Sequence, residues 1–304
     1  MPCEKGFGIN FYLYSMTNHS IQKRNLSFLW LAQTMSQAGD AIYQLALLWL
    51  VLEISNSPII TGFIAMSAYL PALLFGLFAG VFSDKFNRFK LMIFSNVGQA
   101  LTVVIIPFLL LNGHDSLWLI CGLAFLRSCF NTFFQPALQS FIPMLFPRDG
   151  IVKINAILAT SGQIAWMIGP FFAGVLLTLV SLPNLFLVDA VSFILSIGFL
   201  LFIVQPNLPI ETKGASQWDE LKSGLSFLYS QKPLYWMIII TFINNLFIMG
   251  PAIVGLPILV KSSLHGTASD FAFIEGCMAA GALIGSFLVT KLTGKLSNGL
   301  IWGI

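Results

Sequence analysis

The chain has 304 residues, of which 57% are hydrophobic and only 9% are charged, and its mean hydropathy is +0.86. A soluble core of this length cannot bury so much apolar surface, so the sequence predicts that lipid surrounds most of the chain. The net charge of +3 is small and the basic residues are scattered among loops, which excludes nucleic acid as a partner. The four cysteines have no metal-ligand spacing, and neither a metal nor another cofactor is expected.

Eight apolar runs predict eight transmembrane helices in an all-α membrane protein. The runs are about 20 residues long and lack period-2 alternation, which favours helices over the strands of a barrel. A ninth apolar run begins near Leu296, and the chain reaches Ile304 before that helix could cross a bilayer. The eight predicted helices lie near residues 26–52, 59–83, 90–111, 117–145, 153–181, 184–204, 234–260 and 270–291.

The basic residues between these helices fall almost entirely on one side of the membrane. Of the 15 lysines and arginines, Arg127 lies inside a predicted helix and only Lys261 lies in a loop on the other side. Loops rich in lysine and arginine face the cytoplasm. We therefore expect a multi-pass protein of the cell membrane with a cytoplasmic amino terminus.

One long polar stretch divides the chain into two parts. It contains two prolines and a glycine, followed by Trp218–Tyr229, where apolar residues have the spacing of an interfacial amphipathic helix. The predicted divisions are a cytoplasmic tail over 1–23, a six-helix bundle over 24–204, a cytoplasmic linker with this helix over 205–233, and an incomplete second bundle over 234–304.

Much of the scarce charge is concentrated in the turn between the second and third predicted helices. Asp84 lies where a helix ends, so it can pair with Arg88 or cap the amino terminus of a neighbouring helix. Such contacts can form in one conformation and break in another, as a gate requires. In the alternative interpretation the bases of this turn only fix the topology. The predicted gating loop consists of Gly80, Asp84, Lys85, Arg88 and Lys90.

This turn resembles the loop signature of the major facilitator superfamily, with Asn87 in place of a usual glycine and Phe89 in place of a usual base. In the fifth helix, a Gly-Pro pair flanked by small residues resembles the antiporter motif of the same superfamily, which implies export; its alternative role is an ordinary packed kink. That motif consists of Gly169, Pro170 and Gly174.

Four further segments resemble the branch of this superfamily that contains macrolide-efflux proteins and the enterobactin exporter. The resemblance implies a helical bundle of twelve transmembrane helices, of which this chain carries eight and the start of a ninth. It therefore implies that the chain is truncated at its carboxyl end. The segments are Ser36–Asp40, Phe133–Ala137, Asn155–Ala156 and Leu187–Phe193.

Polar side chains inside the membrane mark the candidate site. An ionisable group at bilayer depth costs roughly 2.5–3.5 kcal/mol, so Asp40 in the first helix and Arg127 in the fourth are functional candidates. Each is accompanied by amides on its own helix face. The resemblance implies that both helices line a central cavity, across which the two residues can meet. The accompanying amides are Gln33, Gln37 and Gln44 in the first helix and Asn131 and Gln135 in the fourth.

Two interpretations of this pair are open. In the functional one, Asp40 is the protonation site, and Arg127 modulates it or binds an anionic part of the substrate. In the other, the two residues form a fixed ion pair that only holds the helices together. Asp189 is interpreted as a capping or packing residue near the start of the sixth helix, and Glu275 is either a second titrating group or an interfacial residue.

The sequence contains no pattern typical of an enzyme site or a phosphate-binding loop, so we do not expect an enzyme. The prediction is a secondary active exporter of small hydrophobic or amphiphilic compounds, such as drugs or macrolide-like molecules, driven by proton antiport with alternating access. Its expected partners are the small-molecule substrate, protons and the lipid bilayer. The alternatives are an exporter of a specific endogenous product, such as a siderophore or a lipid, and an inactive, truncated membrane protein.

Overall fold

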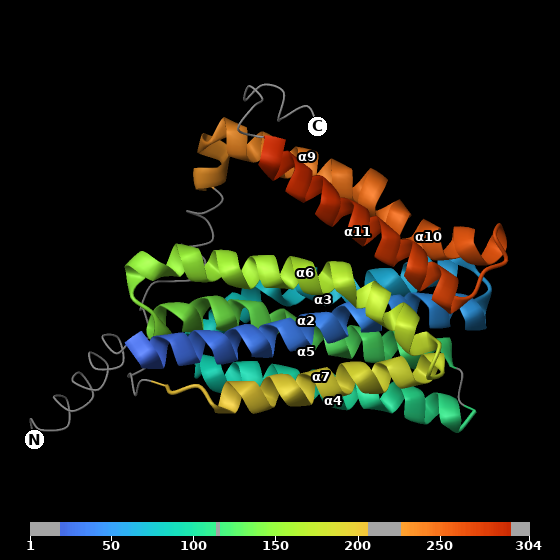
Figure 1. Ribbon diagram of the computed structural model, residues 1–304, viewed down its shortest axis with the longest axis horizontal. Helices are drawn as coiled ribbons and strands as arrows, with labels where there is room; N and C mark the ends of the chain where they lie inside the picture. Colours follow the sequence, from blue (N-terminus) through green and yellow to red (C-terminus); the bar gives the residue numbers. More distant parts are fainter. Residues whose placement is uncertain (1–18, 114–115, 206–225, 293–304) are drawn as a thin grey trace, which may run out of the picture.

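The computed structural model describes residues 19–113, 116–205 and 226–292, and it describes their side chains except at 77, 81, 82, 84, 85 and 286–292. Six long helices come first in the described part of the chain (Figure 1). In lipid every backbone polar group must be satisfied within its own segment, which is why these apolar runs are helical throughout. The six are α2 (His19–Ser55), α3 (Pro58–Lys85), α4 (Arg88–Leu111), α5 (Leu117–Leu145), α6 (Ile151–Leu177) and α7 (Leu182–Leu201).

Two further membrane-spanning helices follow in the described part of the chain. The first is made of α9 (Lys232–Asn244), a π-helical turn η2 (Asn245–Met249) and α10 (Gly250–Ser262). Pro251 has no N–H to donate, and just before it the Gly250 N–H bonds to the carbonyl of Asn245, five residues back. The second is α11 (Ala268–Leu292).

The prediction of an all-α membrane protein with eight transmembrane helices is confirmed, because eight described helices are long and apolar enough to cross a bilayer. Residues 1–18 of the predicted tail, most of the linker at 205–233 and the start of a ninth helix at 296–304 lie outside the described residues. Residues 19–23, which were predicted to belong to the tail, form the first turn of α2. The proposed division into two bundles therefore stays a prediction.

Helix α2 lies at the centre of the first six helices. It packs against α6 and α7, while α5 packs against α3 and α4. The α10–α11 hairpin reaches this bundle from one side, with α11 against α6 and α10 against α2 and α3 (Figure 1). The helix α2 is also the most buried of the eight spans, so a residue in its middle contacts helices rather than lipid.

The interior of the bundle consists of two apolar clusters with polar residues between them. One cluster contains Trp49, Ile106 and Phe186 and extends to Phe271 of α11. The other contains Leu29, Met92 and Phe141, near the opposite ends of the same helices. The buried residues Gln33, Ser36, Ser95, Asn96, Gln99, Arg127, Ser128, Asp189, Ser192 and Ser196 separate the two.

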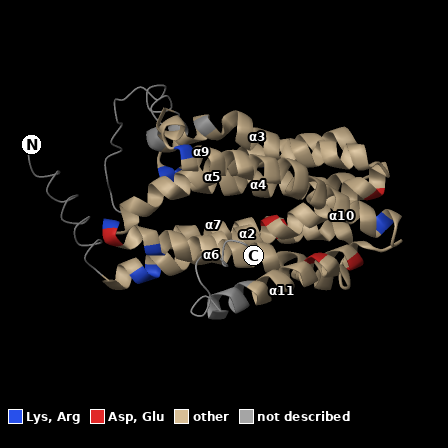
Figure 2. Cartoon of the chain, turned by 90° about the horizontal axis from the view of Figure 1, so that it is seen from above, with Lys and Arg blue, Asp and Glu red and all other residues tan. Residues whose placement is uncertain are grey.

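Most of the described lysines and arginines gather at one end of the helices, as Figure 2 shows. Arg127 lies inside the bundle, and Lys261 lies near the opposite end, against the end of α2. The predicted cytoplasmic turns, between α3 and α4 and between α5 and α6, lie at that end, together with the amino terminus of the described chain. We call the opposite end, where the α2–α3, α4–α5 and α10–α11 turns lie, the outer end.

Candidate functional site

A polar cavity of about 310 Å³ lies inside the bundle, between α2, α3, α5 and α6. Asp40 and Arg127 both line it, so the structure brings together the two ionisable residues that the sequence singled out. Aromatic side chains complete its wall. The lining residues are Asp40, Tyr43, Gln44, Ala68, Tyr69, Ala72, Gly76, Ala124, Arg127, Ser128, Asn131, Thr132, Gln135 and Trp166.

Arg127 forms ion pairs with two carboxylates. Its Nη2 atom donates to Asp40 Oδ1 across the α2–α5 contact and to Asp189 Oδ2 of α7 at 3.1 Å. The two acids differ in exposure, since the Asp40 side chain is 15% exposed and the Asp189 side chain is 0% exposed. The guanidinium carbon also lies 3.7 Å from the ring centroid of Tyr43, within the range of a cation–π interaction. Arg127 is thus held by charge on two sides.

Small residues allow these helices to approach closely. A Cβ atom at Gly39 would lie 2.5 Å from Asp189 Oδ1 and 2.8 Å from the Cβ of Ser192, so only glycine fits between α2 and α7 here. A Cβ atom at Gly169 would lie 2.5 Å from the Cβ of Ala41 in α2. Close approach of backbones through small residues is the usual way in which membrane helices associate.

The predicted amides divide into two groups. Gln44, Asn131 and Gln135 line the cavity, and Gln44 Nε2 donates to the hydroxyl of Tyr69 at 3.2 Å. Gln33 and Gln37 are not among the described residues that line it. A Cβ atom at Gly162 of α6 would meet the side-chain amide of Gln37, which places Gln37 in the α2–α6 contact. The polar face of α2 therefore borders the cavity at Gln44 and packs against α6 at Gln37.

The predicted gating loop lies at the basic end of the bundle, where α3 ends and α4 begins. Gly80 lies in α3, Arg88 is half-buried at the start of α4, and Lys90 is exposed. Asn87 Oδ1 accepts a hydrogen bond from the Lys90 backbone N–H at 3.0 Å, so the asparagine that replaces the usual glycine of the superfamily signature caps α4. The side chains of Asp84 and Lys85 lie outside the description, and the latch stays a prediction.

The antiporter-like motif contacts both parts of the molecule. Gly169 and Pro170 are buried inside α6, with Gly169 against α2. One turn further, a Cβ atom at Gly174 would lie 3.1 Å from the Cβ of Ala272 in α11. The motif therefore lies where α6 packs between the first bundle and the α10–α11 hairpin.

Asp189 is the functional candidate that the sequence interpretation missed. The capping role is wrong, because α7 begins at Leu182 and the carboxylate bonds to Arg127 in the middle of the bundle. A signal was present, since Asp189, Ser192 and Ser196 recur at helical spacing on one buried face of an otherwise apolar helix. Glu275 is half-buried in α11 and is not among the residues that line the cavity.

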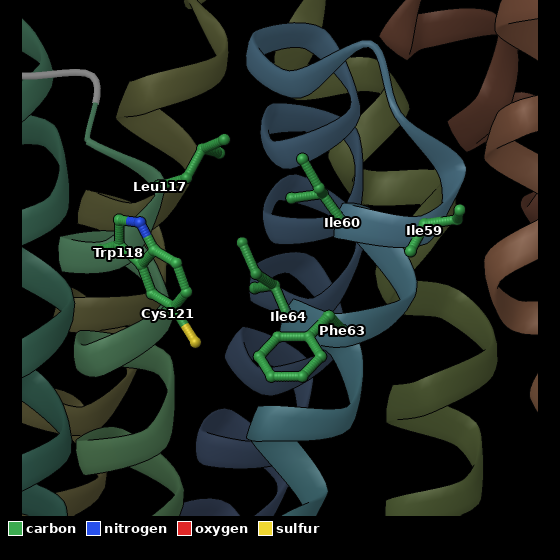
Figure 3. A pocket seen from close by; sticks show the side chains of 7 residues that line it. All are labelled: Ile59, Ile60, Phe63, Ile64, Leu117, Trp118 and Cys121. Carbon is green, nitrogen blue, oxygen red and sulfur yellow. The ribbon is translucent and has the colours of Figure 1, made fainter.

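A second hollow of about 280 Å³ lies between α3 and α5 near the outer end (Figure 3). Its lining is apolar except for the indole N–H of Trp118 and the thiol of Cys121, and it offers no charged side chain. We regard it as a lipid-facing surface and take the Asp40–Arg127 cavity as the candidate site. The hollow is lined by Ile59, Ile60, Phe63, Ile64, Leu117, Trp118 and Cys121.

Comparison with known proteins establishes the family. Residues 18–302 match the family described as transmembrane secretion effector, within the major facilitator superfamily. The chain belongs to this family. The sequence resemblance to the superfamily is therefore confirmed, and the protein is a multi-pass membrane protein with a major-facilitator fold.

Its relatives are distant. An uncharacterized transporter of the superfamily, YvqJ of Bacillus subtilis, is 26% identical over 280 residues, which cover 90% of this chain and 66% of YvqJ. Macrolide efflux protein A of Streptococcus pyogenes is 23% identical over 276 residues, covering 90% of this chain and 68% of that protein. The chain thus spans about two thirds of the length of these relatives.

A solved structure agrees with the fold. It is the crystal structure of a bacterial homologue of the human lysosomal transporter Spinster, in an inward-facing and unoccupied conformation. The two chains superpose with a TM-score of 0.69 at 14% identity, over 92% of this chain and 64% of the other. This similarity shows that the arrangement of helices is shared.

Proposed function

We propose that the protein acts in a secondary active exporter that moves small hydrophobic or amphiphilic compounds out of the cell in exchange for protons. The observation that carries this proposal is the ion pair of Asp40 and Arg127 on the wall of a polar cavity inside the membrane bundle. Ionisable residues at this depth mark substrate and ion pathways in transporters. The relative named as a macrolide efflux protein supports the direction of transport.

Asp40 is the proposed proton carrier. Its side chain reaches the cavity, whereas the side chain of Arg127 is occupied by two carboxylates. A carboxylate that borders a cavity can exchange protons with water that enters it, and its pairing with a cation makes that exchange sensitive to conformation. Alternating access of residues 24–204 and 234–304 about the 205–233 linker would then expose Asp40 to each side in turn.

The cavity favours an amphiphilic cation as the substrate. Tyr43, Tyr69 and Trp166 provide aromatic surface, and the two acids around Arg127 leave an excess of negative charge when both are ionised. An anionic group would have to compete with Asp40 and Asp189 for the guanidinium. The geometry therefore favours drug-like amphiphiles over a siderophore, and it argues against the earlier idea that Arg127 receives an anionic part of the substrate.

The remaining features fit the same proposal. With the basic end of the helices in the cytoplasm, the amino terminus is cytoplasmic and the protein lies in the cell membrane. The turn between α3 and α4, with Gly80, Arg88 and Lys90, would then close the cytoplasmic side in one conformation. Gly169 and Gly174 would let α6 slide between α2 and α11 as the two parts move.

Transport by the reconstituted protein tests the proposal. We expect proteoliposomes with an imposed pH gradient to move tetraphenylphosphonium, a lipophilic cation, and a protonophore to abolish that movement. Asp40→Asn should abolish gradient-driven movement. Glu53→Gln is the matched control, because Glu53 lies on the same helix with its side chain exposed, and it should behave as wild type. Gradient-driven transport by Asp40→Asn would contradict the assignment.

A further inference from the structure

We infer that Asp189 is a positioning residue that holds Arg127 as a fixed counter-ion, so that Asp40 alone exchanges its ion pair for a proton or a cationic substrate. This inference rests on the proposed function, because it assumes that Asp40 carries the proton. The proposed function concerns Asp40 of α2, whereas this inference concerns Asp189 of α7. Removing the two charges should have different effects.

The cluster of Asp40, Arg127 and Asp189 carries one positive and two negative charges when both acids are ionised. One guanidinium contacts two carboxylates, and no other charged side chain lines the cavity in the described part of the chain. Burial makes an uncompensated charge costly, so the cluster as a whole is stable with one of the two acids neutralised. The neutralising group can be a proton or a bound cation.

Asp40 and Asp189 differ in their access to the cavity. Asp40 lines the cavity and is partly exposed, whereas Asp189 has no exposed surface and lies against the backbone of Gly39. The hydroxyl of Ser192, which is not among the residues that line the cavity, donates to Asp189 Oδ1 at 3.4 Å. A proton or ligand arriving through the cavity therefore meets Asp40 first.

Asp40 can exchange its ion pair with Arg127 for a proton. When Asp40 takes a proton from water, its carboxylate becomes a neutral acid and its ion pair with Arg127 is lost, while Arg127 stays paired with Asp189 at 3.1 Å. When a cation then binds, the proton returns to water and Asp40 becomes negative again. Without Asp189 the same protonation would leave a buried guanidinium with no counter-ion, which is unfavourable. Asp189 thus makes the protonation of Asp40 possible.

The other titratable groups near Asp40 do not replace this role. Tyr43 lies on the same helix and packs against Arg127, and Tyr69 of α3 accepts a hydrogen bond from Gln44. Both are neutral phenols at physiological pH. The helix α6 contributes Trp166 to the cavity, which has no titratable group.

Proton release on ligand binding tests the inference on the full chain in detergent, without a need for transport. We expect tetraphenylphosphonium to release about one proton per protein from wild type, as read with a pH indicator dye, and none from Asp40→Asn.

In Asp189→Asn, Asp40 becomes the sole counter-ion of Arg127 and stays ionised. The midpoint of the release profile should therefore move toward acid by about 1–3 pH units, the range over which a neighbouring charge acts. Asp189→Glu keeps the charge and should move the midpoint back toward the wild-type value.

The outcomes separate the two ideas. If wild type releases no proton, the result contradicts both the proposed proton coupling through Asp40 and this inference. If wild type releases a proton through Asp40 but Asp189→Asn has an unshifted profile, only the inference is overturned, and Asp189 has a purely structural role. Infrared difference spectra provide a test that does not depend on folding of the Asp189 variants. One carboxylic acid band, absent in Asp40→Asn, should respond to the ligand, and a second responding carboxyl would overturn the inference.

Discussion

Gly39 determines how closely Asp189 approaches the centre of the bundle. The added methyl of Gly39→Ala would lie 2.5 Å from Asp189 Oδ1, so either the carboxylate or α7 has to move. Forcing an extra methyl group into a packed interior costs about 1–3 kcal/mol. We expect a lower unfolding temperature in detergent and weaker ligand-induced proton release. Gly122→Ala is the control, since a Cβ atom there meets nothing within 4 Å, and equal stability of the two variants would contradict the argument.

Sequence alone could identify Asp40 and Arg127 because each is an isolated charge with amide neighbours on its helix face. It could not place Gln33 and Gln37 outside the cavity, since spacing fixes a helix face but not which neighbour that face meets. Asp189 lies only eight residues into α7, where a capping role was a reasonable interpretation. Its true partner depends on the depth of α7 relative to α5, which is a property of the packed bundle.

At the scale of elements, the α10–α11 hairpin meets the first bundle near the outer end. Lys261 Nζ donates to the backbone carbonyl of Leu52 at 2.7 Å and to Asn56 Oδ1 at 2.9 Å. Trp49 of α2 stacks on Phe271 of α11 with ring centroids 5.8 Å apart. Lys261 is the one basic residue that the sequence placed in a loop on the non-cytoplasmic side, and in the structure it joins α10 to the end of α2.

Lys261→Met should loosen this contact. A hydrogen bond from a charged group contributes about 1.5–3 kcal/mol, so its loss should shift a two-state equilibrium toward an open outer end by roughly tenfold or more. Spin labels on the outer ends of α2 and α10 would report a new, longer distance by pulsed electron resonance. Lys232→Met is the control, because Lys232 is an exposed lysine at the start of α9. A distance distribution identical to wild type would show that Lys261 does not hold the outer end closed.

The turns at which helices change direction were also predictable, because charge and turn residues interrupt the apolar runs. Within the predicted span over 234–260, by contrast, the structure has a π-helical turn at Asn245–Met249. The sequence shows Gly250 and Pro251 at this point, which indicate a disturbance but not its form. Whether a helix there kinks, breaks or adopts a π-turn depends on which carbonyls find new partners.

At the scale of the whole molecule, the contacts between its two parts lie toward the outer end. The pair Lys261 and Leu52, the stack of Trp49 on Phe271 and the packing of Gly174 on Ala272 all join the hairpin to the bundle there. Helix α9, which begins toward the basic end, buries none of its residues in the described structure, and Figure 1 shows it away from the first bundle. The described hairpin is therefore joined to the first bundle near the outer end, and we expect the cavity to be closed there and reachable from the basic end.

This asymmetry predicts the side from which the cavity can be reached. Asn131 lines the cavity with an exposed side chain, and Asn112 lies exposed at the outer turn after α4. In a chain whose four native cysteines are replaced, Asn131→Cys should react with a membrane-impermeant maleimide in inside-out vesicles, and Asn112→Cys only in intact cells. Adding Lys261→Met should make Asn131→Cys reactive from outside as well, because the outer end then opens. Reaction of Asn131→Cys from outside in the unaltered chain would contradict the closed outer end, and reaction of Asn112→Cys only in inside-out vesicles would reverse the predicted orientation.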